Sequence, residues 1–210
     1  MSSALRRVVL VRHGETADHS RERLIGSGDP SLSAEGREHM RRAREKLVGQ
    51  VFDLVVTSPA RRAFQSAAIL TGGAPARLEA DFREIHFGRW EGRSLGEIEA
   101  ADPVLFAQWR DGNPDFEYPG GEPRAAFRAR VRRGLDRLLG SAATGALVVA
   151  HKGVLCEIAQ ELTGARPERP RPELGEENVL TRAADGAWHA GGRSSNPDDL
   201  PIPGPIEIAR

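Results

Sequence analysis

The side chains best suited to chemistry in this sequence stand at or shortly after the ends of short apolar runs. They are His13, Ser58, the pair Arg61-Arg62, and His151. Two histidines with arginines make a poor cation site, because guanidinium groups repel cations. The same groups suit a phosphate dianion, which accepts charge-assisted and bidentate hydrogen bonds. The residue types therefore indicate a local site for a phosphoryl group and no metal.

Three apolar runs rich in β-branched residues predict buried strands. They cover residues 7–11, 52–56 and 146–150. Open α/β sheets bind ligands at the carboxyl ends of their strands. We therefore expect the candidate residues to converge in one crevice, although they are far apart in the sequence.

Helix-forming segments with capping signals alternate with these runs. We predict helices over residues 33–48, 60–70, 124–139 and 154–162. The alternation predicts an α/β fold, a three-layer sandwich in which a largely parallel central sheet carries helices on both faces. Residues 78–84 form a weaker extended segment, and residues 178–183 and 187–190 are candidates for closing edge strands.

The sequence predicts a single domain over residues 1–190, followed by a tail. A chain of 210 residues falls within the usual single-domain range. Residues 86–121 contain short helical pieces and several turn signals, so we interpret them as a small cap insertion. Residues 191–210 are rich in Gly, Pro, Ser and Asp and lack periodicity, which predicts a surface-hugging or partly disordered tail.

The composition argues against several kinds of partner. Thirty basic and thirty acidic residues give a net charge of zero, so no global charge attracts nucleic acid or an anionic membrane. The single cysteine, Cys156, excludes an internal disulfide and a Cys-rich zinc site, and favours a reducing compartment. The sequence shows neither a signal-peptide core nor an apolar stretch long enough to cross a bilayer. We therefore expect a cytoplasmic protein.

Six short motifs follow one another between residues 7 and 165. The first is Val11-Arg12-His13-Gly14-Glu15-Thr16. The others lie at residues 23–26 with 29–33, 57–63 with 65–67, 83–88 with 90–92, 119–122, and 148–151. Together they resemble the histidine phosphatase superfamily, which includes cofactor-dependent phosphoglycerate mutases and many small-molecule phosphatases. A lone Arg-His-Gly would be weak evidence, whereas six ordered motifs are specific.

The resemblance implies a role for each residue of the catalytic set. His13 would attack phosphorus through a ring nitrogen and form a phosphohistidine. Arg12, Arg62 and His151 would surround the three non-bridging oxygens and oppose their charge in the transition state, with neither metal nor cofactor. Glu84 would protonate the departing alkoxide and later deprotonate the attacking water.

Further residues are assigned to substrate binding, and two positions depart from the family pattern. Gly14 would let the backbone approach the phosphate, and Ser58 and Arg23 would lie in the pocket or just behind it. The family commonly has an asparagine where this chain has His19, whose ring could still donate a hydrogen bond. It usually has glycine at the position of Lys152, whose side chain either points away or adds a phosphate contact.

Two further expectations concern the arginine pair and one tryptophan. Arg62 matches the family's phosphate ligand because it directly precedes Ala63, and we expect Arg61 to face solvent. Trp90 belongs either to the core of the cap or to the wall of the substrate pocket.

The function implied is hydrolysis of a small-molecule phosphomonoester. The alternatives are a phosphoglycerate mutase-type phosphotransferase and a non-catalytic phospholigand-binding protein. Two features favour the phosphatase over the mutase. Mutases carry a longer segment where this chain has only residues 92–119, and residues 90–123 contain eight acidic residues and two arginines, which disfavours a doubly phosphorylated acid. The sequence determines neither the substrate nor the oligomeric state, and a homodimer is one alternative.

Overall fold

A six-stranded mixed sheet forms the centre of the computed structural model, which describes residues 4–17, 23–165, 173–191 and 206–208. In spatial order the strands are β4 (Arg77–Leu78), β3 (Leu54–Thr57), β5 (Gly145–Ala150), β1 (Arg7–Arg12), β6 (Glu177–Arg182) and β7 (Trp188–Ala190). The first four are parallel to one another, and β6 and β7 add antiparallel pairings. The sheet is therefore mostly parallel, as predicted.

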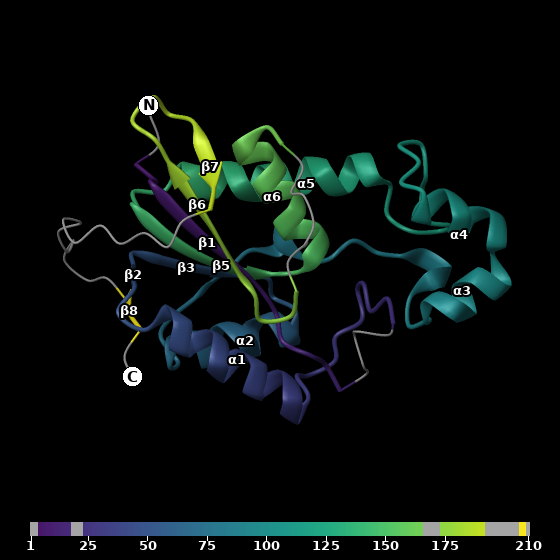
Figure 1. Ribbon diagram of the computed structural model, residues 1–210, viewed down its shortest axis with the longest axis horizontal. Helices are drawn as coiled ribbons and strands as arrows, with labels where there is room; N and C mark the ends of the chain where they lie inside the picture. The colour runs from purple at the N-terminus through teal and green to yellow at the C-terminus, as the bar shows by residue number, and fades with distance from the viewer. Residues whose placement is uncertain (1–3, 18–22, 166–172, 192–205, 209–210) are drawn as a thin grey trace.

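Six α-helices in the described residues complete the fold. They are α1 (Ala34–Leu47), α2 (Arg61–Thr71), α3 (Leu95–Ala101), α4 (Pro103–Arg110), α5 (Arg124–Leu139) and α6 (Lys152–Thr163). Figure 1 shows α1 and α2 on one face of the sheet, α5 and α6 on the other, and α3 and α4 beyond it. This is the three-layer arrangement that the alternation of elements predicts. No helix in the described part of the chain is long and apolar enough to span a membrane.

The central strands are apolar throughout because both of their faces are buried. Along β1, Val8 and Leu10 belong to a core that also contains side chains of α5 and α6. Val9 and Val11 point the opposite way, into a core formed with α1 and α2. Successive strand residues face opposite sides of a sheet, so a strand covered on both sides reads as a continuous apolar run.

Side-chain caps mark the start of one helix that the sequence predicts, α1, and of one helix in the cap, α3. The Ser33 hydroxyl accepts a hydrogen bond from the Gly36 N–H at 2.9 Å and begins α1. In the cap, Ser94 and Glu97 form a reciprocal capping box at the start of α3. The cap also has its own buried apolar cluster of Trp90, Ile98, Phe106 and Phe116. Trp90 is fully buried there, so it belongs to the core of the cap.

The second predicted strand is interrupted at Asp53. It divides into β2 (Val51–Phe52) and β3, because the Asp53 carboxylate accepts hydrogen bonds from the backbone N–H groups of Thr144 and Gly145 and from the Thr144 hydroxyl. These bonds join the strand break to the start of β5. Of the two late strands, β7 is an edge strand as predicted, whereas β6 lies inside the sheet between β1 and β7.

Two segments differ from the sequence prediction. Of the expected extended stretch 78–84 only Leu78 lies in a strand, β4, and a short 3-10 helix (Ala80–Phe82) follows because the Glu79 carboxylate caps it through the Asp81 N–H at 3.1 Å. In the tail, Ile206–Glu207 forms β8 against β2, and Ile208 is buried in the core beneath α1 and α2. Alternating isoleucines near residue 207 were the available signal for that strand.

Candidate active site

The two histidines predicted to converge lie side by side at the ends of neighbouring strands. His13 follows β1 and His151 follows β5, and the parallel register of these strands pairs Arg12 with Ala150. The backbone N–H of His13 donates to the Ala150 carbonyl at 3.1 Å. The centroids of the two imidazole rings are 5.2 Å apart in an edge-to-face arrangement. Both rings are almost fully buried. The strand topology therefore creates the histidine pair that the sequence predicts.

The hydrogen bonding of His13 fixes which of its ring nitrogens can react. Its Nδ1 lies 2.7 Å from the Gly14 carbonyl oxygen. A carbonyl only accepts hydrogen bonds, so Nδ1 carries the proton and Nε2 keeps its lone pair. Burial, followed by the charges of Arg62 and Arg12, lowers the pKa of His13 well below its ordinary value of 6.5. At neutral pH the ring is therefore uncharged, with a nucleophilic Nε2.

Packing against α1 by itself requires glycine at position 14. A Cβ at this position would lie 2.4 Å from the Gly36 carbonyl oxygen in α1, which is far too close. The Gly14 N–H also donates to the Ser66 hydroxyl of α2 at 3.1 Å. The absence of a side chain thus lets the loop after β1 pack against α1 and α2, and this packing places the carbonyl that orients His13.

His151 is oriented by Ser58, the residue directly after β3. Its Nε2 lies 2.9 Å from the Ser58 hydroxyl oxygen, which also accepts the Ala60 N–H at 3.3 Å. Burial is the main cause that lowers the pKa of His151 well below 6.5, and the charge of Arg62 adds to it. Among the described residues, Nδ1 of His151 has no hydrogen-bond partner. This nitrogen is the one that remains available to a ligand.

Arg62 is the buried member of the arginine pair, as predicted. Only 1% of its surface is exposed, whereas 60% of the Arg61 side chain is exposed beside Asp29. The Arg62 guanidinium donates to the carbonyls of Gly28 at 2.5 Å and Gly26 at 2.8 Å. The loop before α1 therefore fixes this guanidinium, whose charge lowers the pKa values of both histidines.

Glu84 is a buried carboxyl group with a raised pKa. Burial raises its pKa above the ordinary 4.5, against the opposing effect of backbone N–H groups and of Arg62 and Arg12. The carboxylate accepts hydrogen bonds from the Ile85 N–H at 3.0 Å and from the Gly153 N–H at 3.2 Å. A Cβ at Gly153 would approach Glu84 Oε1 to 2.6 Å, so glycine leaves the space that this carboxyl occupies.

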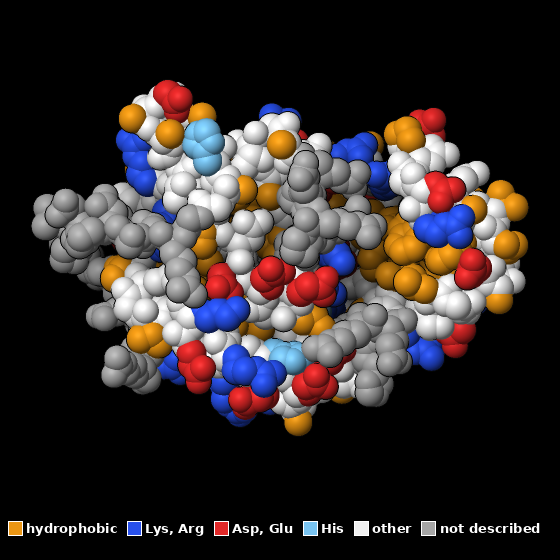
Figure 2. All heavy atoms as spheres, viewed as in Figure 1, with side chains coloured by type: hydrophobic (Ala, Val, Ile, Leu, Met, Phe, Trp, Pro, Cys, Tyr) orange, Lys and Arg blue, Asp and Glu red, His pale blue; other side chains and the backbone are white. Residues whose placement is uncertain are grey.

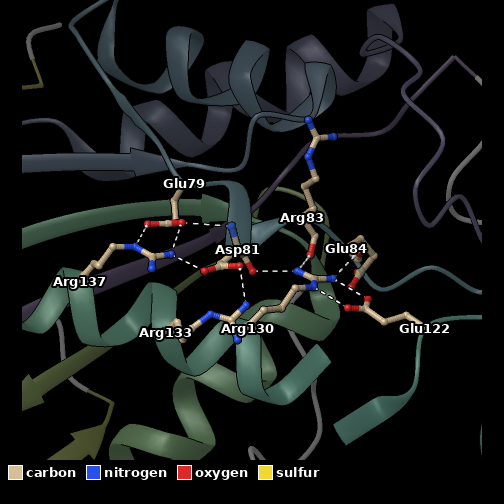
Figure 3. A network of polar contacts seen from close by, with 8 residues as sticks. All are labelled: Glu79, Asp81, Arg83, Glu84, Glu122, Arg130, Arg133 and Arg137. Atoms are coloured by element: carbon tan, nitrogen blue, oxygen red, sulfur yellow. Dashed lines mark hydrogen bonds and ion pairs between the residues drawn. The ribbon is translucent and has the colours of Figure 1, made fainter. Parts of the chain in front are cut away.

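Arg130 of α5 connects the segment that carries Glu84 to the Pro-Gly-Gly-Glu turn, as Figure 3 shows. Its guanidinium pairs with both oxygens of Glu122 at 2.7 and 2.8 Å. It also donates to the backbone carbonyls of Asp81 at 2.8 Å, Arg83 at 2.6 Å and Glu84 at 3.1 Å. Sequence reasoning missed Arg130, although a charged residue three positions after the buried Phe127 was an available signal.

Two cavities meet at Glu84. The smaller has a volume of about 180 Å³ and is also lined by Arg62 and Arg130. The larger, of about 1110 Å³, is lined by Arg12, by Glu84 and by side chains of the cap. In Figure 2, apolar side chains gather beside the cap helices, with Lys and Arg side chains next to them. His13 is 4% exposed and is not among the described residues that line either cavity.

The lining of the larger cavity does not support the charge argument against a doubly phosphorylated acid. None of the acidic residues of segment 90–123 is among the residues that line the larger cavity. Two of their carboxylates bind other side chains. Glu97 pairs at 2.9 Å with Arg23, which itself lines the larger cavity, and Asp102 pairs with Arg89 and accepts the Trp90 ring N–H at 2.7 Å. The cap is acidic in composition, but the cavity beside it is not.

The remaining predicted positions are distributed around this site. Arg23 lines the larger cavity, where it also donates to the Gly92 carbonyl at 2.7 Å. Lys152 lines the same cavity from the first turn of α6. His19 lies outside the described residues. Within the described part of the chain, no cluster of three or more His, Cys, Asp or Glu side chains could hold a metal ion.

Comparison with known proteins identifies the family of this chain. Residues 8–188 match the model of the histidine phosphatase superfamily, branch 1. The chain belongs to this superfamily. It is similar to the glucosyl-3-phosphoglycerate phosphatase of Mycolicibacterium vanbaalenii, with 32% identity over 170 residues that cover 76% of this chain and 75% of that protein.

Solved structures of histidine phosphatases share the fold. The structure of a mycobacterial glucosyl-3-phosphoglycerate phosphatase has a TM-score of 0.73 and 28% identity, covering 88% of this chain and 96% of that one. The α-ribazole phosphatase of Shigella flexneri has a TM-score of 0.74 and 26% identity, covering 88% and 94%. The superfamily relatives named here are phosphatases, which supports phosphatase activity for this chain.

Proposed function

We propose that this histidine phosphatase is a metal-independent phosphomonoesterase that acts through a phosphohistidine on His13. The observation that carries the proposal is the state of that ring: it is neutral, its Nδ1 proton is held by the Gly14 carbonyl, and two arginine charges act on it. A buried imidazole is an effective nucleophile only when it is uncharged. Positive charge beside it is useful when the partner is a phosphoryl dianion.

In the first half-reaction, His13 Nε2 attacks phosphorus as the bond from phosphorus to the alcohol oxygen breaks. Arg12, Arg62 and His151 oppose the charge on the three non-bridging oxygens. Glu84, whose raised pKa favours the protonated form, donates its proton to the departing alkoxide. The Gly14 carbonyl stabilises the positive charge that develops on the imidazole, because it accepts the Nδ1 proton.

In the second half-reaction, the Glu84 carboxylate takes a proton from water as that water attacks phosphohistidine. The bond between phosphorus and Nε2 then breaks, and inorganic phosphate and neutral His13 result. The substrate that we propose is a small-molecule phosphomonoester with a bulky alcohol group, because the cavity beyond Arg12 measures about 1110 Å³. The relatives named for glucosyl-3-phosphoglycerate and for α-ribazole phosphate are consistent with an alcohol group of that size.

Hydrolysis of 4-nitrophenyl phosphate in the presence of EDTA tests this proposal. We expect wild-type turnover to persist in EDTA and to be lost by at least about 1,000-fold in His13→Ala, because the nucleophile is gone. His189→Ala, at an exposed position on the edge strand β7, is the matched control and should retain full activity. Loss of turnover in EDTA would contradict metal independence. Equal activity of wild type and His13→Ala would contradict the mechanism.

A further inference from the structure

Cationic side chains outnumber carboxylates around the larger cavity. It is lined by Arg12, Arg23, Arg110, Arg124, Arg128 and Lys152, and by Glu84, Glu157 and Glu173. Arg12 and Glu84 belong to the proposed phosphoryl site, and Glu173 acts on Arg12. Apart from that site, the charged side chains among the described lining residues are five cations and one carboxylate, Glu157.

Most of these cations already bind groups of the protein. Arg23 pairs with Glu97, and Arg110 hydrogen-bonds to Asp111 at 3.1 Å. Arg124 donates to three backbone carbonyls of the loop that follows α4. Arg128, one helical turn later on α5, is exposed and has no hydrogen bond or ion pair among the described residues. Its charge is therefore available to a ligand in the cavity.

Lys152 brings a second cation to the same space from α6, which packs against α5. It directly precedes Gly153, whose N–H holds the Glu84 carboxylate. Lys152 therefore lies close in the chain to the proton-transfer group. Both cations thus line the cavity that Glu84 also borders.

The cavity also has an apolar wall formed by Leu24, Leu95, Trp109, Phe116 and Tyr118. Aromatic side chains with a polar edge suit the faces of sugar or aromatic rings. The Tyr118 hydroxyl accepts the Trp109 ring N–H at 3.3 Å, which fixes the relative orientation of these two rings. The wall thus offers a binding surface for a ring, beside a positively charged edge.

We propose that Arg128 and Lys152 form a second anion subsite, so that the preferred substrates are phosphomonoesters of a ring-bearing alcohol that carries a second anionic group. This inference rests on the proposed phosphatase function and specifies its substrate class. The first anion is the phosphoryl group at His13, and the second is a carboxylate or phosphate bound by the two cations. The ring between them packs on the apolar wall.

Two matched pairs of synthetic substrates test the subsite. One pair is 4-(carboxymethyl)phenyl phosphate and its neutral carboxamide, and the other is the corresponding biphenyl pair, which reaches further into the cavity. The methylene group keeps the leaving phenols of each pair electronically alike. For at least one pair we expect wild type to prefer the carboxylate about tenfold in kcat/KM, which is the strength of one charge-assisted hydrogen bond. Arg128→Gln should reduce this preference to about threefold or less, and adding Lys152→Gln should bring it to about one.

Arg132→Gln is the control for a general loss of positive charge. Arg132 lies one turn after Arg128, pairs with Glu161 at 3.2 Å, and is not among the residues that line the cavity. We expect it to leave the preference at the wild-type value. Equal kcat/KM for both members of both pairs would overturn the subsite while leaving the phosphatase proposal intact, as would equal effects of the Arg128 and Arg132 variants. No turnover of any of the four probes would overturn the phosphatase proposal and the subsite with it.

Discussion

Arg130 should affect catalysis through Glu84 without touching the substrate. Its guanidinium pairs with Glu122 and holds three successive parts of the segment that carries Glu84 (Figure 3). The side chains of Arg130 and Glu122 are only 15% and 21% exposed, so solvent screens this pair weakly. Removing one partner of a buried pair costs about 3–5 kcal/mol, and partial exposure places Arg130→Met near the lower value.

We expect Arg130→Met to lower the free energy of unfolding by about 3 kcal/mol and kcat by about 100-fold. The second figure follows from positioning, since a displacement of about 1 Å in a catalytic group costs about two orders of magnitude. Arg133→Met is the matched control on the same helix. Arg133 is 59% exposed and reaches Asp81 at 3.3 Å, so its loss should cost about 1 kcal/mol or less and leave kcat unchanged.

Urea denaturation and steady-state assays would measure both effects, and a double variant separates them. In Arg130→Met/Glu122→Leu neither partner is left as an unpaired buried charge, so part of the lost stability should return. The backbone carbonyls of Arg83 and Glu84 would still lack their hydrogen bonds from Arg130, so kcat should stay low. If kcat recovers together with stability, Arg130 has only a structural role and the positioning argument is refuted.

Three further predictions concern proton transfer and burial. Glu84→Gln should reduce kcat/KM at least tenfold more for phenyl phosphate than for 2,4-dinitrophenyl phosphate, because phenoxide is the poorer leaving group and needs a proton. Equal losses of kcat/KM for the two substrates would exclude Glu84 as the general acid. Gly153→Ala should lower kcat about tenfold, because the new Cβ would displace the Glu84 carboxyl. Gly96→Ala, where a Cβ meets open space, should leave kcat unchanged. Steady-state kinetics would compare the two variants, and equal kcat values would contradict the proposed contact between position 153 and Glu84. The pKa values of His13 and His151 are lower in the folded protein than in the unfolded chain, so unfolding below pH 6.5 takes up protons. The free energy of unfolding is therefore highest above pH 6.5. It falls by about 1.4 kcal/mol per pH unit for each histidine as the pH decreases toward the folded-state pKa values. Denaturation between pH 8 and pH 5 should therefore show a shallower slope for His151→Asn, and an unchanged slope would show that His151 does not titrate in this way.

The sequence predicts the sheet, and the meeting of the two strand-end histidines, where the signal is local and periodic. The apolar runs and capping residues locate β1, β5, α1 and α5 to within about two residues. The parallel pairing of β1 with β5 then brings His13 and His151 together, as the strand-end rule predicts. Their roles in catalysis remain predictions until variants are measured.

What the sequence does not reveal depends on contacts between distant residues. Asp53 interrupts a strand only because the start of β5 supplies three donors to its carboxylate. The acidic residues of the cap could be counted from the sequence, but not the direction in which they point. Arg130 looks like one of several arginines on an amphipathic helix, and its importance follows from the carbonyls of Asp81, Arg83 and Glu84 that the fold brings to it.

The position of Glu84 between two cavities has a consequence for the order of events in turnover. The larger space borders Glu84 on one side and the smaller space, of about 180 Å³, borders it on the other. At roughly 30 Å³ per molecule, the smaller space has room for a few waters. In the proposed mechanism, water in this space can lie beside the carboxyl before the alcohol has left, so we expect a short-lived phosphoenzyme and poor competition of added alcohols with water as acceptors.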